Sequence, residues 1–380
     1  MHYGNSEYVQ LGKSGIFYEI SQIYRKIPDN VRYRFSSLHF HYLARCKRLR
    51  VKNHMKFPNS YRLPASVSLF ILFLLIPVQL MVDNPMLILE RFVPGAGWIE
   101  IALIAIYGAV VAYHMQDPSK VQAWRRYTWL AFSVVFFSQL ILGIIGFDKF
   151  LMTGKLHLPI PMMILGGPVY RGHLSVMSIL FVSTLVLSGP AWCSHLCYFG
   201  AIDSISSSGK TRRSPIRNKW ALKSTVLLLV IAGAIVLRWL KVPVFTATLL
   251  ASGFGVIGLG LILLVSRKEG RMVHCTAYCP IGTIVNLTRF VNPFRLTIDQ
   301  NSCTECMVCT TTCKYDALNR TDITAKKPGL TCTLCGDCIS SCHAGSIQYR
   351  FPGLSSTRAR NLYLFITISL HAATMALARI

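Results

Sequence analysis

The stretch PAWCSHLCYFGAID (Pro190–Asp203) ends an apolar run, and MVHCTAYCPIGTIV (Met272–Val285) ends a second run in the same way. Each stretch carries two cysteines four residues apart, followed by a glycine and an isoleucine at matching positions: Cys193, Cys197, Gly200 and Ile202, then Cys275, Cys279, Gly282 and Ile284. Each copy follows a pair of apolar runs. The sequence therefore predicts a parallel repeat of two-span units that delivers paired thiols to one side of a membrane.

The composition also indicates a membrane protein. Of the 380 residues, 52% are hydrophobic, and the mean hydropathy is +0.44. Six runs approach or exceed the roughly 18 apolar residues that a spanning helix needs: about 65–82, 98–115, 129–147, 173–190, 221–240 and 244–266. A run at 361–378 fits either a seventh span or an interfacial helix. We expect an all-α polytopic membrane protein.

The distribution of positive charge sets the expected orientation. The chain has 40 Lys and Arg residues against 15 Asp and Glu, and the basic residues gather before residue 65 and in alternate connections: 117–126, 210–219 and 267–271. This positive-inside pattern places those connections and the N-terminus in the cytoplasm, and 83–97, 148–172 and 241–243 outside. The spans account for the basic charge, so we expect no nucleic-acid partner. No signal peptide is expected, because the first sixty residues are polar and basic.

A cysteine-dense segment follows the sixth run. It reads CTECMVCTTTC (Cys303–Cys313) and CTLCGDCISSC (Cys332–Cys342), the spacing of bacterial two-cluster ferredoxins, in which the fourth cysteine of each motif ligates the other cluster. This predicts one 4Fe-4S cluster on Cys303, Cys306, Cys309 and Cys342, and a second on Cys332, Cys335, Cys338 and Cys313. The alternative is a pair of zinc sites. Lys314 and His343 stand where the ferredoxin motif has proline.

The paired cysteines predict a third cluster. Residues i and i+4 share a helix face, so each pair would aim two sulfurs at one object, and two pairs would supply four thiolates. We therefore expect Cys193, Cys197, Cys275 and Cys279 to hold a third 4Fe-4S cluster at the cytoplasmic membrane surface. The alternative is that they are small buried cysteines that fill helix contacts.

These features predict five segments. A basic cytoplasmic N-terminal segment covers 1–64, two accessory transmembrane helices cover 65–128, and a repeated four-helix core with the two CxxxC motifs covers 129–290. A small α+β ferredoxin-like domain with two 4Fe-4S clusters covers 291–352, and a C-terminal apolar helix covers 353–380. The basic run around Cys46 suits contact with anionic membrane lipids; the alternative is a solvated tail.

Over roughly 129–350 the chain resembles the NapH/MauN-type polytopic membrane ferredoxins, and also the cores of CcoG and NosR. The resemblance rests on the spans, the two CxxxC motifs and the double ferredoxin motif. CTAYCPIG fits the family's CxxxCP form at Cys279 and Pro280, whereas Tyr198 stands where that form has proline. The resemblance implies a bacterial-type inner (cytoplasmic) membrane and electron transfer between the quinone pool and a partner reductase or dehydrogenase. The chain would then be the electron-transfer component of a quinol dehydrogenase.

The outward connection 148–172 offers candidate residues for quinone chemistry. Oxidation of a quinol needs a proton acceptor beside an apolar slot, and histidine titrates in the useful range. We predict His157 and His173 as acceptors, with Arg171 as partner of the oxyanion. The alternative is an ordinary loop with interfacial anchors. Two further functions stay open: an assembly factor that reduces a metal ion, as the CcoG resemblance implies, and a redox-sensing regulator.

Overall fold

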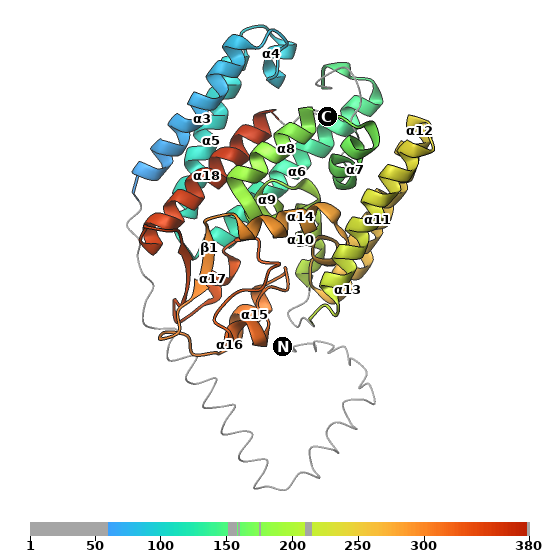
Figure 1. Ribbon diagram of the computed structural model, residues 1–380. Coiled ribbons are helices and arrows are strands. Elements are labelled where there is room, and N and C mark those ends of the chain that lie inside the picture. Colours follow the sequence, from blue (N-terminus) through green and yellow to red (C-terminus); the bar gives the residue numbers. More distant parts are fainter. Residues whose placement is uncertain (1–59, 151–157, 159, 175, 210–214, 378–380) are drawn as a thin grey trace, which may run out of the picture. The chain divides into compact units, whose positions relative to one another are not determined.

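The computed structural model describes residues 60–150, 158, 160–174, 176–209 and 215–377 (Figure 1). Within them, six helices are long and apolar enough to cross a membrane: Arg62–Met81, Gly97–Met115, Val121–Ile145, Ser178–Gly209, Lys219–Trp239 and Val244–Glu269. The six-span helical fold is thus confirmed. The predicted basic segment up to residue 59, with Cys46, lies outside the described residues, as does His157.

The spans are built from helices that differ in regularity. Their main elements are α3 (Arg62–Met81), α5 (Gly97–Met115), α6 (Val121–Ile145), α8 (Val176–Ser188), α11 (Lys219–Trp239) and α12 (Val244–Gly260). The fourth span runs on beyond the expected residue 190, because η2 (Gly189–Ala191), α9 (Trp192–His195), α10 (Tyr198–Ser206) and η3 (Ser207–Gly209) follow α8. A π-helix, η4 (Leu261–Ser266), and α13 (Arg267–Glu269) lengthen the sixth.

The connections between spans are short except for one. The first outward connection holds α4 (Ile88–Phe92), and η1 (Asp148–Phe150) follows α6. The expected loop at 148–172 contains a further helix, α7 (Pro161–Arg171), which packs against α11 and α12. Pro161 starts this helix at a position where no backbone donor is needed, and Gly172 ends it in the left-handed conformation at φ 77°.

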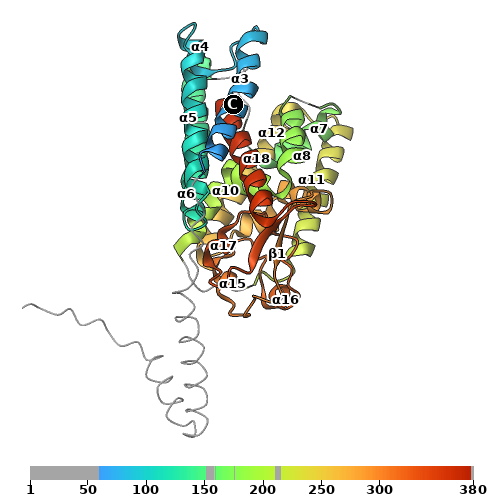
Figure 2. The same ribbon diagram turned by 90° about the vertical axis from the view of Figure 1, so that its left-hand side faces the viewer.

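The C-terminal run forms one continuous helix, α18 (Ser356–Leu377), which lies beside α3 and α5 (Figure 2). Arg360 on this helix donates to the carbonyl oxygens of Met115 and Gln116, at 2.8 and 2.7 Å. His371 is buried and lies 2.9 Å from the hydroxyl of Tyr107. Within the described residues α18 is not among the six helices that are long and apolar enough to cross a membrane, although it packs against α3 and α5.

The cysteine-dense segment forms a small α+β unit at one end of the bundle (Figure 1). Strand β1 (Arg295–Ile298) pairs antiparallel with β2 (Ile347–Arg350), so that Leu296 faces Tyr349 and Ile298 faces Ile347. Three short helices lie between the strands: α15 (Val308–Thr312), α16 (Arg320–Thr324) and α17 (Asp337–Ser341). The sheet closes the segment into one unit, as the crossed ferredoxin motif predicts.

The two halves of this unit repeat the same backbone conformation. The residues two and four positions after the first cysteine of each motif are left-handed: Glu305 and Met307 in one half, Leu334 and Gly336 in the other. Backbone of this kind turns successive N–H groups toward one point, an arrangement that occurs at many iron–sulfur sites. The repeat in sequence is therefore a repeat in structure.

Candidate functional site

Each paired motif is broken between its two cysteines. Cys193 lies in α9, whereas Cys197 is extended (φ −83°, ψ 114°) and precedes the first residue of α10. In the second copy Cys275 lies in the π-helix η5 (His274–Tyr278), and Cys279 is extended (φ −71°, ψ 119°) before α14 (Pro280–Leu287). The expected continuous helix with thiols at i and i+4 is therefore wrong. The helix break, not helical periodicity, orients each pair.

The two copies share a further contact that explains their glycines. A side chain at Gly200 would lie 2.8 Å from the carbonyl oxygen of Cys193, and one at Gly282 would lie 2.8 Å from that of Cys275. No L-residue with a Cβ fits so close to a backbone oxygen without a shift. Both glycines are therefore needed for the turn that returns the chain over the first cysteine of its pair.

The four paired thiols meet in one buried place. Cys193, Cys197, Cys275 and Cys279 are between 6 and 9% exposed. Burial raises the pKa of Cys275 well above its usual value, and the charges of Asp203, Cys197, Cys279 and Cys193 raise it further. The amide of Gly282 lies 3.5 Å from the sulfur of Cys279 and donates to it. The structure thus brings together the four cysteines that the repeat predicts, which we call the four-thiol site.

The ferredoxin-like unit groups its cysteines in two further sets of four. Cys342 lines one cavity together with Cys303, Cys306 and Cys309. Burial raises the pKa of Cys309 to about 12, and the nearby Cys342, Cys306 and Cys303 contribute. These cysteines are partly exposed, and we call them the outer set.

The second set lies deeper. Burial raises the pKa of Cys338, and its neighbours Cys335, Cys332 and Cys313 raise it further. The amide of Ala317 donates to the sulfur of Cys313 at 3.3 Å. We call these four cysteines the inner set. Cys313 and Cys342 each lie with the three cysteines of the other motif, as the crossed ferredoxin pattern predicts.

The inner set packs directly against the four-thiol site. Tyr315 and Trp129 lie in one buried cluster with Cys275, and Cys313 and Cys335 pack against it. Tyr315 donates to the carbonyl oxygen of Cys193 at 3.2 Å. Trp129 donates to that of Cys197 at 2.7 Å. Tyr315 and Trp129 therefore contact both the paired motifs and the buried cluster against which the inner set packs.

Buried polar contacts hold this junction together. Arg125 on α6 pairs with Asp337 on α17, at 2.6 and 3.0 Å, and donates to the carbonyl oxygen of Ser194 at 3.1 Å. On the other side Arg271 pairs with Asp316 at 2.9 Å and donates to the carbonyl oxygen of Cys313 at 3.2 Å. The ferredoxin-like unit is therefore fixed to both copies of the paired motif.

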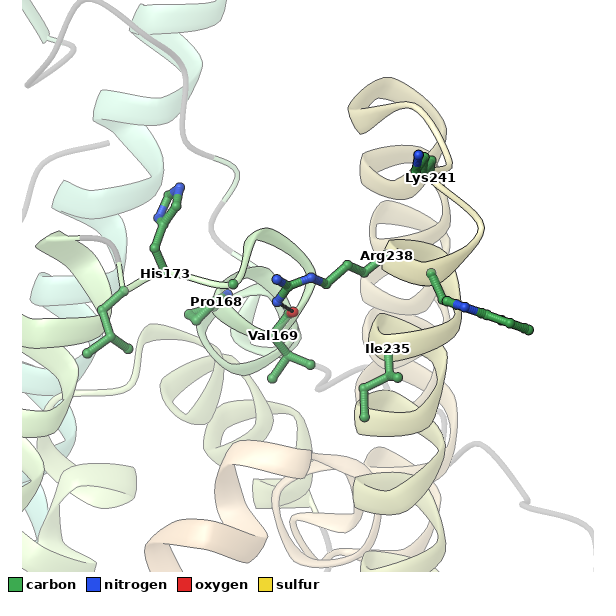
Figure 3. Close-up of a pocket in the computed structure, with 9 residues that line it drawn as sticks. Pro168, Val169, His173, Ile235, Arg238 and Lys241 are labelled. Atoms are coloured by element: carbon green, nitrogen blue, oxygen red, sulfur yellow. Dashed lines mark hydrogen bonds between the residues drawn. The ribbon is translucent and has the colours of Figure 1, made fainter.

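The residues predicted to bind quinone, His173 and Arg171, do not lie among the three sets of thiols. His173 lines a cavity of about 850 Å³ between α7 and the end of α11, which Arg171 does not line (Figure 3). Figure 3 shows Arg238 reaching from α11 to Val169, whose carbonyl oxygen accepts from it at 3.4 Å. The cavity is remote from the four-thiol site. Ile235, which lines the cavity, lies about 18 Å along α11 from Lys223, the residue of this helix that lies beside the four-thiol site, at 1.5 Å per residue.

Several functional candidates have no local signal in the sequence. Arg125, Trp129 and Tyr315 meet residues far along the chain, so no local pattern points to them. Arg238 likewise joins the cavity only through folding. Lys223 did offer a signal, because an ionisable residue within a spanning helix is by default a functional candidate. It lies beside the four-thiol site.

The three sets of four thiols fit the ligand requirement of 4Fe-4S clusters, which are held by four cysteine thiolates each. The N–H groups that point at Cys279 and Cys313 are of the kind that surrounds cluster sulfurs. The left-handed residues of the ferredoxin-like unit fit as well.

A match to a known protein family supports 4Fe-4S binding by the paired cysteines. Residues 172–215 and 251–295, which hold the paired cysteines, match the family described as "4Fe-4S binding domain". Protein MJ0749 of Methanocaldococcus jannaschii, which is named as uncharacterized, is 22% identical over 175 residues, or 46% of this chain and 70% of that protein. No solved structure matches the chain. Together with the apolar helices, the family match defines an iron–sulfur electron-transfer protein with the features of a membrane ferredoxin.

Proposed function

We propose that this protein relays electrons between the membrane quinone pool and a partner redox enzyme through three 4Fe-4S clusters. The four-thiol site, the inner set and the outer set would each hold one. Such clusters supply one-electron transfer at potentials that the surrounding protein tunes. The proposal extends to a NapH/MauN-type role in a bacterial-type inner membrane, with the ferredoxin-like unit in the cytoplasm; the basic connections support that orientation.

The observation that carries the proposal is the order of the thiol groups. The four-thiol site lies at the end of the apolar helices, Tyr315 and Trp129 connect it to the inner set, and the outer set follows. Exposure rises along this order, because the cysteines of the outer set are partly exposed whereas those of the four-thiol site are buried. A soluble partner reductase or dehydrogenase subunit would meet the chain at the outer set.

The cavity between α7 and α11 is the candidate quinone site. Its lining includes apolar groups of Pro168, Val169, Leu174 and Ile235 and polar groups of His173, Arg238 and Lys241. Oxidation of a quinol releases protons together with electrons, and His173 would accept a proton there. Arg171 stays a candidate for the oxyanion role from sequence alone, and Arg238, which lines this cavity, is a second candidate for it. His157 keeps its place as a candidate from sequence alone.

Addition of duroquinol to the anaerobically purified protein tests the proposal. We expect the visible absorbance of the clusters to bleach and an EPR signal of the reduced form to develop. Retention of the oxidised spectrum would refute the quinol relay. It would favour an assembly factor that reduces a metal ion, for which the partly exposed outer set is also suited. The test for that alternative is to reduce the protein with dithionite, add an oxidised metal ion, and measure whether the protein reduces the ion.

A further inference from the structure

Lys223 is a buried cation without a described partner. It lies in the first turns of α11 and is 0% exposed. Among the described residues its Nζ makes no hydrogen bond, and no carboxylate pairs with it. The ring of Trp220 lies 5.9 Å from the Nζ, close enough for a weak cation–π contact. An ammonium that is removed from water and unpaired costs several kcal/mol or more, so a structural role alone does not explain it.

Three cysteines of the four-thiol site interact electrostatically with Lys223, and one turn of that site lies against its ammonium. A side chain at Gly282 would lie 3.6 Å from the Nζ, so the ammonium lies against the turn after Cys279. The charged groups that act on it are Cys193, Cys279 and Cys275, together with Lys219. Lys219 is itself held by Asp316 at 2.9 Å. The anionic partner of Lys223 is therefore the four-thiol site.

The two copies of the repeat differ at this position. In the first copy the glycine of the turn, Gly200, faces the ring of Trp129, which would lie 2.5 Å from a side chain there. In the second copy Gly282 faces the ammonium of Lys223. Trp129 and Lys223 each come from the first helix of their two-span unit, α6 and α11. One side of the four-thiol site thus meets the indole of Trp129, over which Arg125 lies at 5.2 Å with its charge paired to Asp337, and the other meets the ammonium of Lys223.

We propose that Lys223 is a positioning residue that sets the reduction potential of the cluster at the four-thiol site, by holding a fixed positive charge against one side of it. The inference rests on the proposed third cluster. A cubane with four thiolates is negative and gains one further negative charge when one electron enters, with no bond made or broken. A nearby ammonium stabilises the reduced form more than the oxidised form, and so raises the potential. Burial strengthens the effect, because the low dielectric screens the charge weakly.

The test is a dithionite titration of the anaerobically purified full chain, followed by EPR at defined potentials. Lys223→Met removes the charge at nearly constant volume, and Lys223→Gln removes it while keeping a polar end. Lys268→Met is the matched control, because Lys268 is exposed near the same end of the bundle. Iron and sulfide are counted in every variant before titration.

We expect Lys223→Met to shift the redox equilibrium of one signal at least tenfold toward the oxidised form, which is about 59 mV for one electron. Lys223→Gln should shift the same signal in the same direction, and Lys268→Met should shift none. Wild-type potentials in both Lys223 variants at full iron content would overturn the role of Lys223 alone. A wild-type protein with iron for only two clusters would overturn the proposed third cluster, and this inference with it.

Discussion

The buried pair of Arg125 and Asp337 should hold the ferredoxin-like unit to the membrane helices. The side chains are 2 and 5% exposed and meet through two hydrogen bonds, at 2.6 and 3.0 Å. Asp337→Asn keeps the shape of the side chain but leaves the guanidinium of Arg125 buried without its charge partner. Removal of one member of such a pair costs about 3–5 kcal/mol. The expected loss is thus a large part of the stability of an ordinary domain.

The assay is urea denaturation of the detergent-solubilised protein, followed by cluster absorbance. With an m-value of about 2 kcal/mol per molar, a loss of about 4 kcal/mol moves the midpoint down by about 2 M. The control is Lys120→Ala, which removes an exposed pair: Lys120 and Asp117 are 3.9 Å apart and 52 and 35% exposed. Exposed pairs contribute about 0–1 kcal/mol, so this midpoint should move by at most about 0.5 M.

A double variant separates the pair from its two members. Arg125→Met combined with Asp337→Asn removes both charges, so it should be more stable than Asp337→Asn alone. The reasoning fails if Asp337→Asn moves the midpoint no further than Lys120→Ala does. It also fails if the stability lost in the double variant equals the sum of the losses in the two single variants, because the two residues would then act independently.

Three further predictions concern the thiols and the cavity. Cys275→Ser should lose about four irons per chain in an iron assay, whereas Cys46→Ser should lose none; equal iron in both would contradict the four-thiol site. Burial raises the pKa of Cys309 to about 12, and ligation releases the thiol proton, so iron uptake during reconstitution should rise with pH over the range below that pKa; a flat profile would speak against thiolate ligation. Arg238→Gln should raise the KM for duroquinol with unchanged cluster potentials, and unaltered kinetics relative to Lys268→Gln would exclude the cavity.

Much of the fold follows from local patterns in the sequence. Apolar runs of sufficient length predict the six spans, since a bilayer demands continuous helices of that length. The double ferredoxin motif predicts a closed unit in which Cys313 and Cys342 each join the three cysteines of the other motif. The structure groups these cysteines in that way. The matching of Cys193 with Cys275 predicts the meeting of the paired thiols, because a parallel repeat delivers both to one side.

Other features depend on contacts that no local pattern contains. The segment Pro161–Arg171 reads as a loop because it holds two prolines and two glycines, yet packing against α11 and α12 makes it a helix. The sequence does not predict the helix breaks at Cys197 and Cys279, because the i, i+4 spacing of the cysteines fits a continuous helix equally well. Arg125 and Asp337 are 212 residues apart, so only the folded chain reveals the pair.

The most direct test of the central claim is a count of iron and acid-labile sulfide in the anaerobically purified protein, followed by addition of duroquinol under absorbance and EPR. Three cubanes predict about twelve irons and as many sulfides per chain, with bleaching on addition of the quinol. About eight irons would contradict a cluster at the four-thiol site. Zinc in place of iron would contradict the iron–sulfur assignment, and twelve irons without any response to quinol would contradict the relay from the quinone pool.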